Sequence, residues 1–420
     1  MKSKVILSVV CLALVCAMAV NFAGCNAVSG EDLMEGITPS DVRTREPDVD
    51  FAESQMELSV KLFKAMSAES EDENLLISPL SIQLALAMTA NGADGKTREE
   101  MESLLGGEIP LEDLNEYLRS YVDSLPSGEK YKFTVANSIW IRDEEGRLTI
   151  EEDFLRANAD YYGASAYKAP FDKSTVKDIN NWVKQNTDGM IGKVIDEISY
   201  EAIMYLINAL VFEAEWQDIY ERTQIYDGVF TTDNGEERDV EMMFSSESKY
   251  FKTENAKGFF KNYKDAKYSF VGILPNGDIT LDAYIESLDA AELLEALENA
   301  SVGMVNVDLP KFEYDYELDM NDTLKALGMP TAFDAENADF SRLGESVYGN
   351  IYIGKVLHKT HITVDARGTK AGAVTVIEMA DDAMAMPPLT ITFDRPFMYM
   401  IIDNETNLPI FMGAVRDIGK

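Results

Sequence analysis

Residues 74–101 read NLLISPLSIQLALAMTANGADGKTREEM, and a serine and a proline follow the short apolar run at the start. Serine is a favoured N-cap of a helix, and Ser78 immediately precedes Pro79. Proline suits the first turn of a helix, because the N–H group that it lacks would stay unpaired there. The segment therefore predicts a helix that begins at Pro79 and ends near Gly92.

The rest of the chain shows helix patterns early and strand patterns late. Residues 51–67 and 175–188 carry apolar side chains three or four positions apart, which is typical of amphipathic helices. Strands are predicted for residues 133–141, 202–212 and 268–275, and for most of the chain after residue 350. This order predicts a mixed α+β fold with large sheets.

The composition is strongly acidic, with 74 Asp and Glu residues against 37 Lys and Arg residues in a chain of 420. Phosphate groups bind to clusters of Lys and Arg, so the composition argues against a nucleic-acid partner. An anionic membrane surface would repel the body as well. Two interpretations stay open: the charge steers a basic partner toward the molecule, or it only keeps the surface well solvated.

The three cysteines are Cys11, Cys16 and Cys25, so a disulfide framework is excluded for the body of the protein. A basic start is followed by a nearly unbroken apolar run over residues 5–20, which is typical of a signal peptide. No later segment is long and apolar enough to predict a membrane-spanning helix.

The sequence at residues 22–25, Phe-Ala-Gly-Cys, resembles a bacterial lipobox. That resemblance implies removal of residues 1–24 and lipidation of Cys25; an ordinary cleaved signal peptide is the alternative. We expect a flexible tether over residues 25–50, because they are polar and contain glycine and proline. One domain would follow over residues 51–420, secreted and held at the cell surface, with only the lipid in the membrane.

Short motifs in the body, in their order along the chain, resemble those of the serpins, the serine protease inhibitors. The motifs are residues 74–101, 136–140 (ANSIW), 179–183 (INNWV), 208–212 (NALVF) followed by Trp216, 309–312 (LPKF), 324–329 (LKALGM), 393–397 (FDRPF) and 410–413 (IFMG). The resemblance implies the serpin fold, an α+β fold with three β-sheets and about eight to nine helices. It also implies an exposed reactive-centre loop near residues 366–388.

The expected activity is inhibition of a serine protease by a monomer, and not catalysis. The chain has two histidines, His358 and His361, and no G-x-S-x-G motif or cysteine nucleophile in its body. Two histidines three residues apart in a strand point to opposite faces, which is poor geometry for a metal site. No metal or cofactor is therefore expected.

The resemblance places His358 in a buried polar cluster beneath the main sheet, with Ser78, Ser81 and Asn208 as its partners. Helix capping or ordinary buried polar groups are the alternative for each residue alone. Such contacts break and re-form at modest net cost, which suits a sheet that must open. The resemblance places Trp216 at the top of this sheet, where loop insertion would begin, and plain core packing is compatible with that role.

The expected hinge of the loop begins after the strand that ends near Asp365. In the family, the protease cleaves the loop and forms an acyl-enzyme, and the loop then inserts as a new strand into the main sheet. The two-residue period of a strand places small or apolar side chains on one face, and the segment up to Met386 has no proline. Ala366 and Lys370 stand where the family usually has glutamate. The hinge residues are Gly368, Thr369, Lys370, Ala371, Gly372, Ala373, Val374 and Thr375.

Two positions of the cleaved bond stay open. Counting forward from the hinge gives Asp382–Ala383, and counting back from residues 393–397 gives Ala385–Met386, with Met384 between them. The absence of Lys and Arg between Lys370 and Arg395 disfavours trypsin-like proteases, whose specificity pocket pairs with a cation. Alanine and methionine favour elastase-like proteases, whereas cleavage after Asp382 would suit an Asp-specific protease. The alternative function is a non-inhibitory serpin-fold binding protein at the cell surface.

Overall fold

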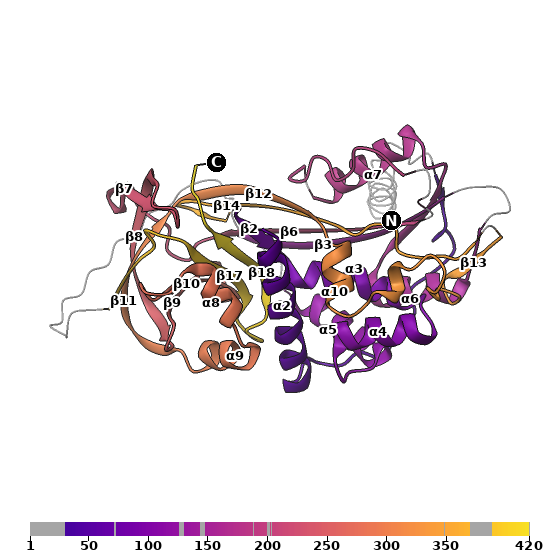
Figure 1. The fold of residues 1–420 in the computed structure, drawn as a ribbon, viewed down its shortest axis with the longest axis horizontal. Coiled ribbons are helices and arrows are strands. Elements are labelled where there is room, and N and C mark those ends of the chain that lie inside the picture. Colours follow the sequence, from indigo (N-terminus) through magenta and orange to yellow (C-terminus); the bar gives the residue numbers. More distant parts are fainter. Residues whose placement is uncertain are drawn as a thin grey trace, which may run out of the picture.

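The computed structural model describes residues 30–70, 73–125, 130–142, 148–187, 189–199, 202, 204–347, 349–369 and 389–419. Figure 1 shows a long sheet that crosses the molecule, with most helices on one side and α7 on the other. The described residues form nine α-helices. These are α2 (Val49–Glu69), α3 (Pro79–Ala90), α4 (Gly95–Gly106), α5 (Leu111–Ser124), α6 (Glu152–Tyr162), α7 (Lys173–Asn186), α8 (Leu281–Ser287), α9 (Ala290–Glu298) and α10 (Asn321–Ala326).

The helix predicted after Ser78 has the expected ends. Ser78 has extended backbone dihedrals, and its hydroxyl accepts a hydrogen bond from the Ser81 N–H. Pro79 is the first helical residue, and α3 ends at Ala90, two residues before Gly92. This helix is buried almost all round, because it lies between the main sheet and the other helices.

The long sheet in Figure 1 has seven strands in the order β1-β5-β3-β6-β15-β14-β12. The strands are β1 (Glu31–Asp32), β5 (Ser165–Ala169), β3 (Tyr131–Arg142), β6 (Met204–Glu215), β15 (Gly368–Thr369), β14 (Leu357–Val364) and β12 (Phe312–Asp319). β15 lies between two strands that are far apart in the sequence, so the centre of the sheet depends on a pairing distant along the chain.

A second sheet has nine strands, and β7 pairs at its side with β8. The path is β16 (Leu389–Thr392), β11 (Ser301–Pro310), β8 (Glu237–Lys252), β9 (Ala256–Asn262), β10 (Tyr268–Pro275), β17 (Phe397–Asp403), β18 (Pro409–Val415) and β2 (Leu75–Ile77), with β7 at Ile225–Thr231. A third, two-stranded sheet joins β13 (Gly344–Ser346) to β4 (Leu148–Ile150). The three sheets and nine helices confirm the expected fold.

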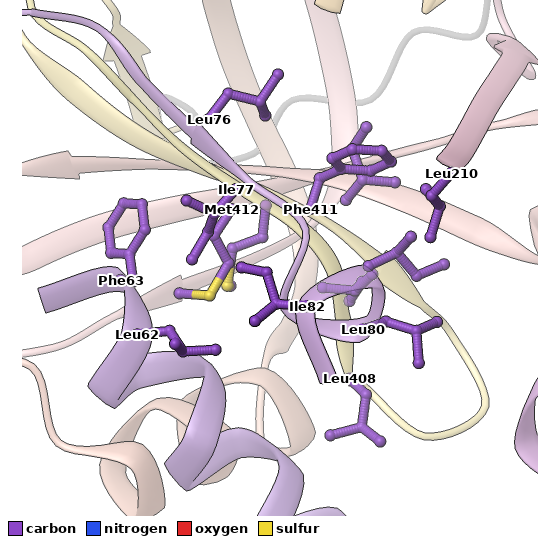
Figure 2. Close-up of a cluster of buried hydrophobic side chains, with 14 of the residues drawn as sticks. Leu62, Phe63, Leu76, Ile77, Leu80, Ile82, Leu210, Leu408, Phe411 and Met412 are labelled. Atoms are coloured by element: carbon purple, nitrogen blue, oxygen red, sulfur yellow. The ribbon is translucent and has the colours of Figure 1, made fainter. Parts of the chain in front are cut away.

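The main core lies between the sheets and the helices that begin the domain. Figure 2 shows Phe63 of α2, Ile77 of β2, Ile82 of α3 and Met412 of β18 in one apolar cluster. β10, β17 and β18 are buried along their whole length, which matches their continuous apolar sequences. Burial of this apolar surface is the main favourable contribution to folding.

The segment before α2 packs on the body from residue 30 onward, contrary to the flexible tether expected over residues 25–50. β1 pairs with the edge strand β5, and the Leu33 N–H donates to the Ala166 carbonyl at 2.9 Å. Further along, the Arg45 guanidinium binds the carboxylates of Asp113 and Glu116. Polar composition alone did not reveal these partners, which lie on α5 and β5. In the part of the chain that the structure describes, no helix is long and apolar enough to span a membrane.

Candidate functional site

The candidate site lies in the middle of the seven-stranded sheet, where β15 joins β6 to β14. Thr369 is paired with Ala214 of β6 on one side and with Val364 of β14 on the other. Gly368 is paired with Glu215. Because β15 is antiparallel to both neighbours, the start of the expected hinge already has the position and direction of a central strand.

A tight turn leads from β14 into β15. The Asp365 carboxylate accepts hydrogen bonds from the N–H groups of Arg367 and Gly368, at 2.7 and 3.3 Å. The backbone of Gly368 has a φ of 154°, and a Cβ atom added there would lie 2.0 Å from the Ala214 carbonyl oxygen. Only glycine fits this position without strain, so the turn depends on Gly368.

Aromatic side chains pack against the turn and against the start of β15. Trp216 is fully buried, and its indole N–H donates to the Asp365 carbonyl at 2.8 Å. Its ring stacks on Tyr263 with centroids 4.4 Å apart, and the Tyr263 hydroxyl lies 2.7 Å from the Thr369 hydroxyl. Trp216 therefore packs in the core and also binds the turn.

At the other end of β14, the structure describes contacts among three residues of the expected polar cluster: Ser78, Ser81 and His358. The Ser78 N–H donates to Nε2 of His358 at 3.2 Å, and the Ser78 hydroxyl caps α3 through the Ser81 N–H. Burial lowers the pKa of His358 to about 4, so the ring is neutral at neutral pH. Asn208 lies in β6 opposite Asn137 of β3, and its side chain lies outside what the structure describes.

The second histidine faces away from this cluster. His361 Nδ1 lies 3.0 Å from an Asp315 carboxylate oxygen, and Nε2 lies 3.2 Å from the Thr363 hydroxyl. His358 is buried and His361 is partly exposed, as the two-residue period of a strand requires. Among the residues that the structure describes, no group of three metal-binding side chains comes together.

Between β6 and β14 lies a small cavity of about 30 Å³. Leu210 and Phe212 of β6 line one side of it, and Thr360 and Ile362 of β14 line the other. Thr369 closes its end next to β15. The cavity is mostly apolar and lies on the path that an extension of β15 would follow.

The structure also shows residues around the turn that no sequence motif indicated. The Tyr220 N–H donates to the Ala366 carbonyl at 2.8 Å, so Tyr220 also holds the turn. Beneath its ring lies the ammonium of Lys261, 4.4 Å from the ring centroid and 2.8 Å from a Glu247 carboxylate oxygen. The Lys261 side chain is only 3% exposed. A lysine within the apolar run that precedes Tyr263 is the one sequence signal that points to this buried ion pair.

Several predicted residues lie outside the described ranges, so the structure does not test them. They are Cys25, the rest of the hinge (Lys370, Ala371, Gly372, Ala373, Val374 and Thr375) and the candidate cleavage residues Asp382, Ala383, Met384, Ala385 and Met386.

The described residues form a long sheet in which the two-residue strand β15 lies between β6 and β14. The family model "Serpin (serine protease inhibitor)" matches residues 53–418, and the chain belongs to this family. Human neuroserpin is 29% identical over 381 residues, which cover 86% of this chain and 90% of neuroserpin. Horse leukocyte elastase inhibitor is 27% identical, with 84% of this chain and 96% of the relative covered.

Among solved structures, the thermophilic serpin tengpin in its native state has a TM-score of 0.89 to this chain. It is 47% identical, with 93% of this chain and 100% of tengpin covered. The latent state of tengpin gives a TM-score of 0.80 over 90% of this chain and 100% of tengpin. The described structure is thus more similar to the native than to the latent form of that relative.

Proposed function

We propose that this serpin inhibits serine proteases by a cleaved loop that inserts into its main sheet. The observation that carries the proposal is β15: Gly368 and Thr369 are already paired between β6 and β14. Insertion would extend a strand that exists, so the costly step of bringing the hinge into register is already complete. Cleavage after the hinge would free the loop to follow, with the acylated protease attached.

The register of β15 supports this extension. In both ladders, continued pairing places Ala371 opposite Phe212 and Ile362, and Ala373 opposite Leu210 and Thr360. These four partners are among the residues that line the cavity, so small alanine side chains would enter a limited space. A large residue on this face would overpack the core, which typically costs about 1–3 kcal/mol.

The same register brings the loop to the buried histidine. Thr375 would lie opposite His358 of β14 and opposite Asn208 of β6. A threonine hydroxyl can donate to or accept from a neutral imidazole, so it could take over contacts that break as the strands separate. This arrangement supports the role of the cluster as a switch.

We propose elastase-like proteases as the targets and a lipid anchor at Cys25 as the means of attachment. The segment from Met379 to Met386 contains only Ala, Met and Asp, which suits a small apolar specificity pocket and not a tryptic one. One relative is named leukocyte elastase inhibitor, which agrees with this choice. The anchor, the secreted location and the bacterial lipoprotein type rest on the residues before and at Cys25.

The test is incubation of the full mature protein with elastase, followed by denaturing electrophoresis and mass spectrometry. A covalent complex larger than either protein is expected, together with a peptide released from the carboxyl side of the cut. The mass of that peptide distinguishes Asp382–Ala383 from Ala385–Met386. Complete cleavage without any complex would contradict inhibition and favour a non-inhibitory binding protein. Complex formation with trypsin but not with elastase would contradict only the target class.

A further inference from the structure

The second sheet presents an exposed outer face near the entry of the chain into β16. Along β11, Val305, Val307 and Leu309 are buried, so Met304, Asn306 and Asp308 point to the opposite face. Along β8, Met243 and Ser245 are buried, so Phe244 points outward. Asp308 and Phe244 are paired across the two strands, which shows that these outward residues share one face.

This face carries three of the large apolar side chains that are exposed in the described residues. Met304 is 65% exposed, Tyr226 44% and Phe244 37%. Single exposed apolar residues are common on soluble proteins, whereas several on adjacent strands mark interaction surfaces. A β-bulge between Val302 and Val305 adds one residue to β11, so Val302, which pairs with Lys249 beyond the bulge, is not counted on this face.

Hydrogen bonds hold the polar centre of the same face. The Tyr226 hydroxyl donates to one Asp308 carboxylate oxygen at 2.6 Å, and the Thr392 hydroxyl donates to the other at 3.0 Å. Ser246 donates to Asn306 at 2.8 Å. These hydrogen bonds join β7, β8, β11 and β16. The apolar side chains therefore lie on a surface whose strands are held together.

The position of this face points to its partner. β16 begins at Leu389, directly after the proposed bait loop, and Leu389 pairs in parallel with Val305. Met304 therefore lies beside the point where the loop joins the sheet. A protease that holds the loop in its cleft would come to this end of the molecule. A second copy of the chain is a poorer partner, because every copy has a formal net charge of −37 and copies repel one another.

We propose that the outer face of β7, β8 and β11 is a secondary docking surface for the protease that cleaves the loop. Met304 and Phe244 would contact apolar surface of the protease beside the carboxyl-terminal part of the loop. The proposal rests on the proposed function. A loop alone supplies only part of a stable interface, which buries roughly 800 Å² on each partner. This face would supply additional area and set how fast the protease associates.

The test compares the full protein with the double variant Met304→Ser/Phe244→Ser. Elastase is the probe, and the second-order rate constants of loop cleavage and of covalent complex formation are measured. Both rate constants are expected to fall about fivefold to tenfold, in the range seen when exposed apolar anchors of an interface are truncated. The matched control is Val347→Ser: Val347 is 75% exposed and follows β13, at the opposite end of the molecule in Figure 1. The control should keep the rates of the original protein.

Three results would overturn the docking surface. One is equal cleavage rates for the double variant and the original protein. Another is an equal loss of rate in the Val347→Ser control. The third is dimerisation of the original protein, abolished by the double variant, in sedimentation experiments. A synthetic peptide of residues 376–392 corrects for any change in the protease preparation. Failure of the proposed function is distinct, because the loop would then be cleaved without a complex while the variant could still slow cleavage.

Discussion

The two edges of β6 differ, although they belong to one strand. Toward β3, the strand is paired from Ala214 opposite Tyr131 to Met204 opposite Ile141 without a break. Toward β14, the ladder in the described residues runs through the two residues of β15 and is followed by a cavity. One edge is paired along its whole length, and the other is paired with only two described residues of β15. The proposed inhibition needs this difference, because insertion would have to separate β6 from β14 while the rest of the sheet keeps its register.

The largest expected effect on stability comes from replacing a buried tryptophan, and one tryptophan lies near each edge of β6. Trp216→Ala should lower the free energy of unfolding by about 3–5 kcal/mol, because it removes a fully buried ring that also binds the turn. Urea denaturation measures this loss. Amide hydrogen exchange should also become faster at Thr369.

Trp140→Ala is the control for the other edge. Trp140 is fully buried in β3 and packs on Tyr167 of β5. A similar loss of stability is expected, but exchange at Thr369 should stay slow. Equal acceleration in both variants would contradict the distinction between the two edges.

The next largest expected effect is a pH dependence of the stability, caused by a histidine of β14 on the β15 side of β6. Burial lowers the pKa of His358 from 6.5 to about 4, so the unfolded chain binds a proton there at a pH where the folded chain does not. This histidine should therefore lower the free energy of unfolding by about 3 kcal/mol as the pH falls from 6.5 to 4, with no further loss below.

Thermal denaturation at several pH values measures this dependence. His358→Gln keeps an acceptor for the Ser78 N–H and should remove that component of the pH dependence. His361→Gln changes the partly exposed histidine on the other face of β14 and should retain it. A pH dependence that His358→Gln leaves unchanged would contradict the assignment.

A smaller loss is expected from Gly368→Ala. The added Cβ would lie 2.0 Å from the Ala214 carbonyl oxygen at a φ of 154°, and strain of this kind costs about 1–3 kcal/mol. The stability loss is modest, but β15 should detach, so cleavage by elastase should give far less covalent complex. Gly354→Ala is the matched control, because its added Cβ meets nothing within 4 Å. Undiminished complex formation by Gly368→Ala would show that insertion does not depend on a preformed β15.

The smallest expected effect comes from a single hydrogen bond. Tyr263→Phe leaves the buried Thr369 hydroxyl without the partner that lies 2.7 Å away, which should cost about 1 kcal/mol. The double variant Tyr263→Phe/Thr369→Val removes both partners and should recover most of that loss. Urea denaturation of the two variants measures the difference. Equal stability of the single variant and the original protein would mean that the hydroxyl pair does not hold β15.

Patterns that are local in the sequence predicted much of the fold. Ser78 and Pro79 predicted the start of α3, and the apolar run at 268–275 coincides with β10. The two-residue period also predicted that His358 and His361 face opposite sides. These features depend on a few neighbouring residues, so a short segment of the sequence is enough to predict them. The family resemblance added the number of sheets and helices, which no short segment predicts.

Other features could not be predicted because their partners are distant in the chain. A flexible tether is expected over residues 25–50, yet within its described part Arg45 binds carboxylates on α5 and β1 extends the sheet. The ion pair of Lys261 and Glu247 depends on the pairing of β9 with β8 and on the ring of Tyr220 above it. Composition describes how polar a segment is, and it does not describe which surface the segment will meet.

The family motifs indicate the class of the protein, and local patterns indicate the N-cap of α3, the apolar strand β10 and the two-residue period of β14. These local patterns follow from backbone preference or from side-chain size. The folded structure was needed to show that Gly368 and Thr369 lie between β6 and β14, with Trp216, Tyr220 and Tyr263 around their turn. The physical reason is that a strand at the centre of a sheet is defined by the two edges beside it, and here those edges come from residues about 150 positions apart in the chain.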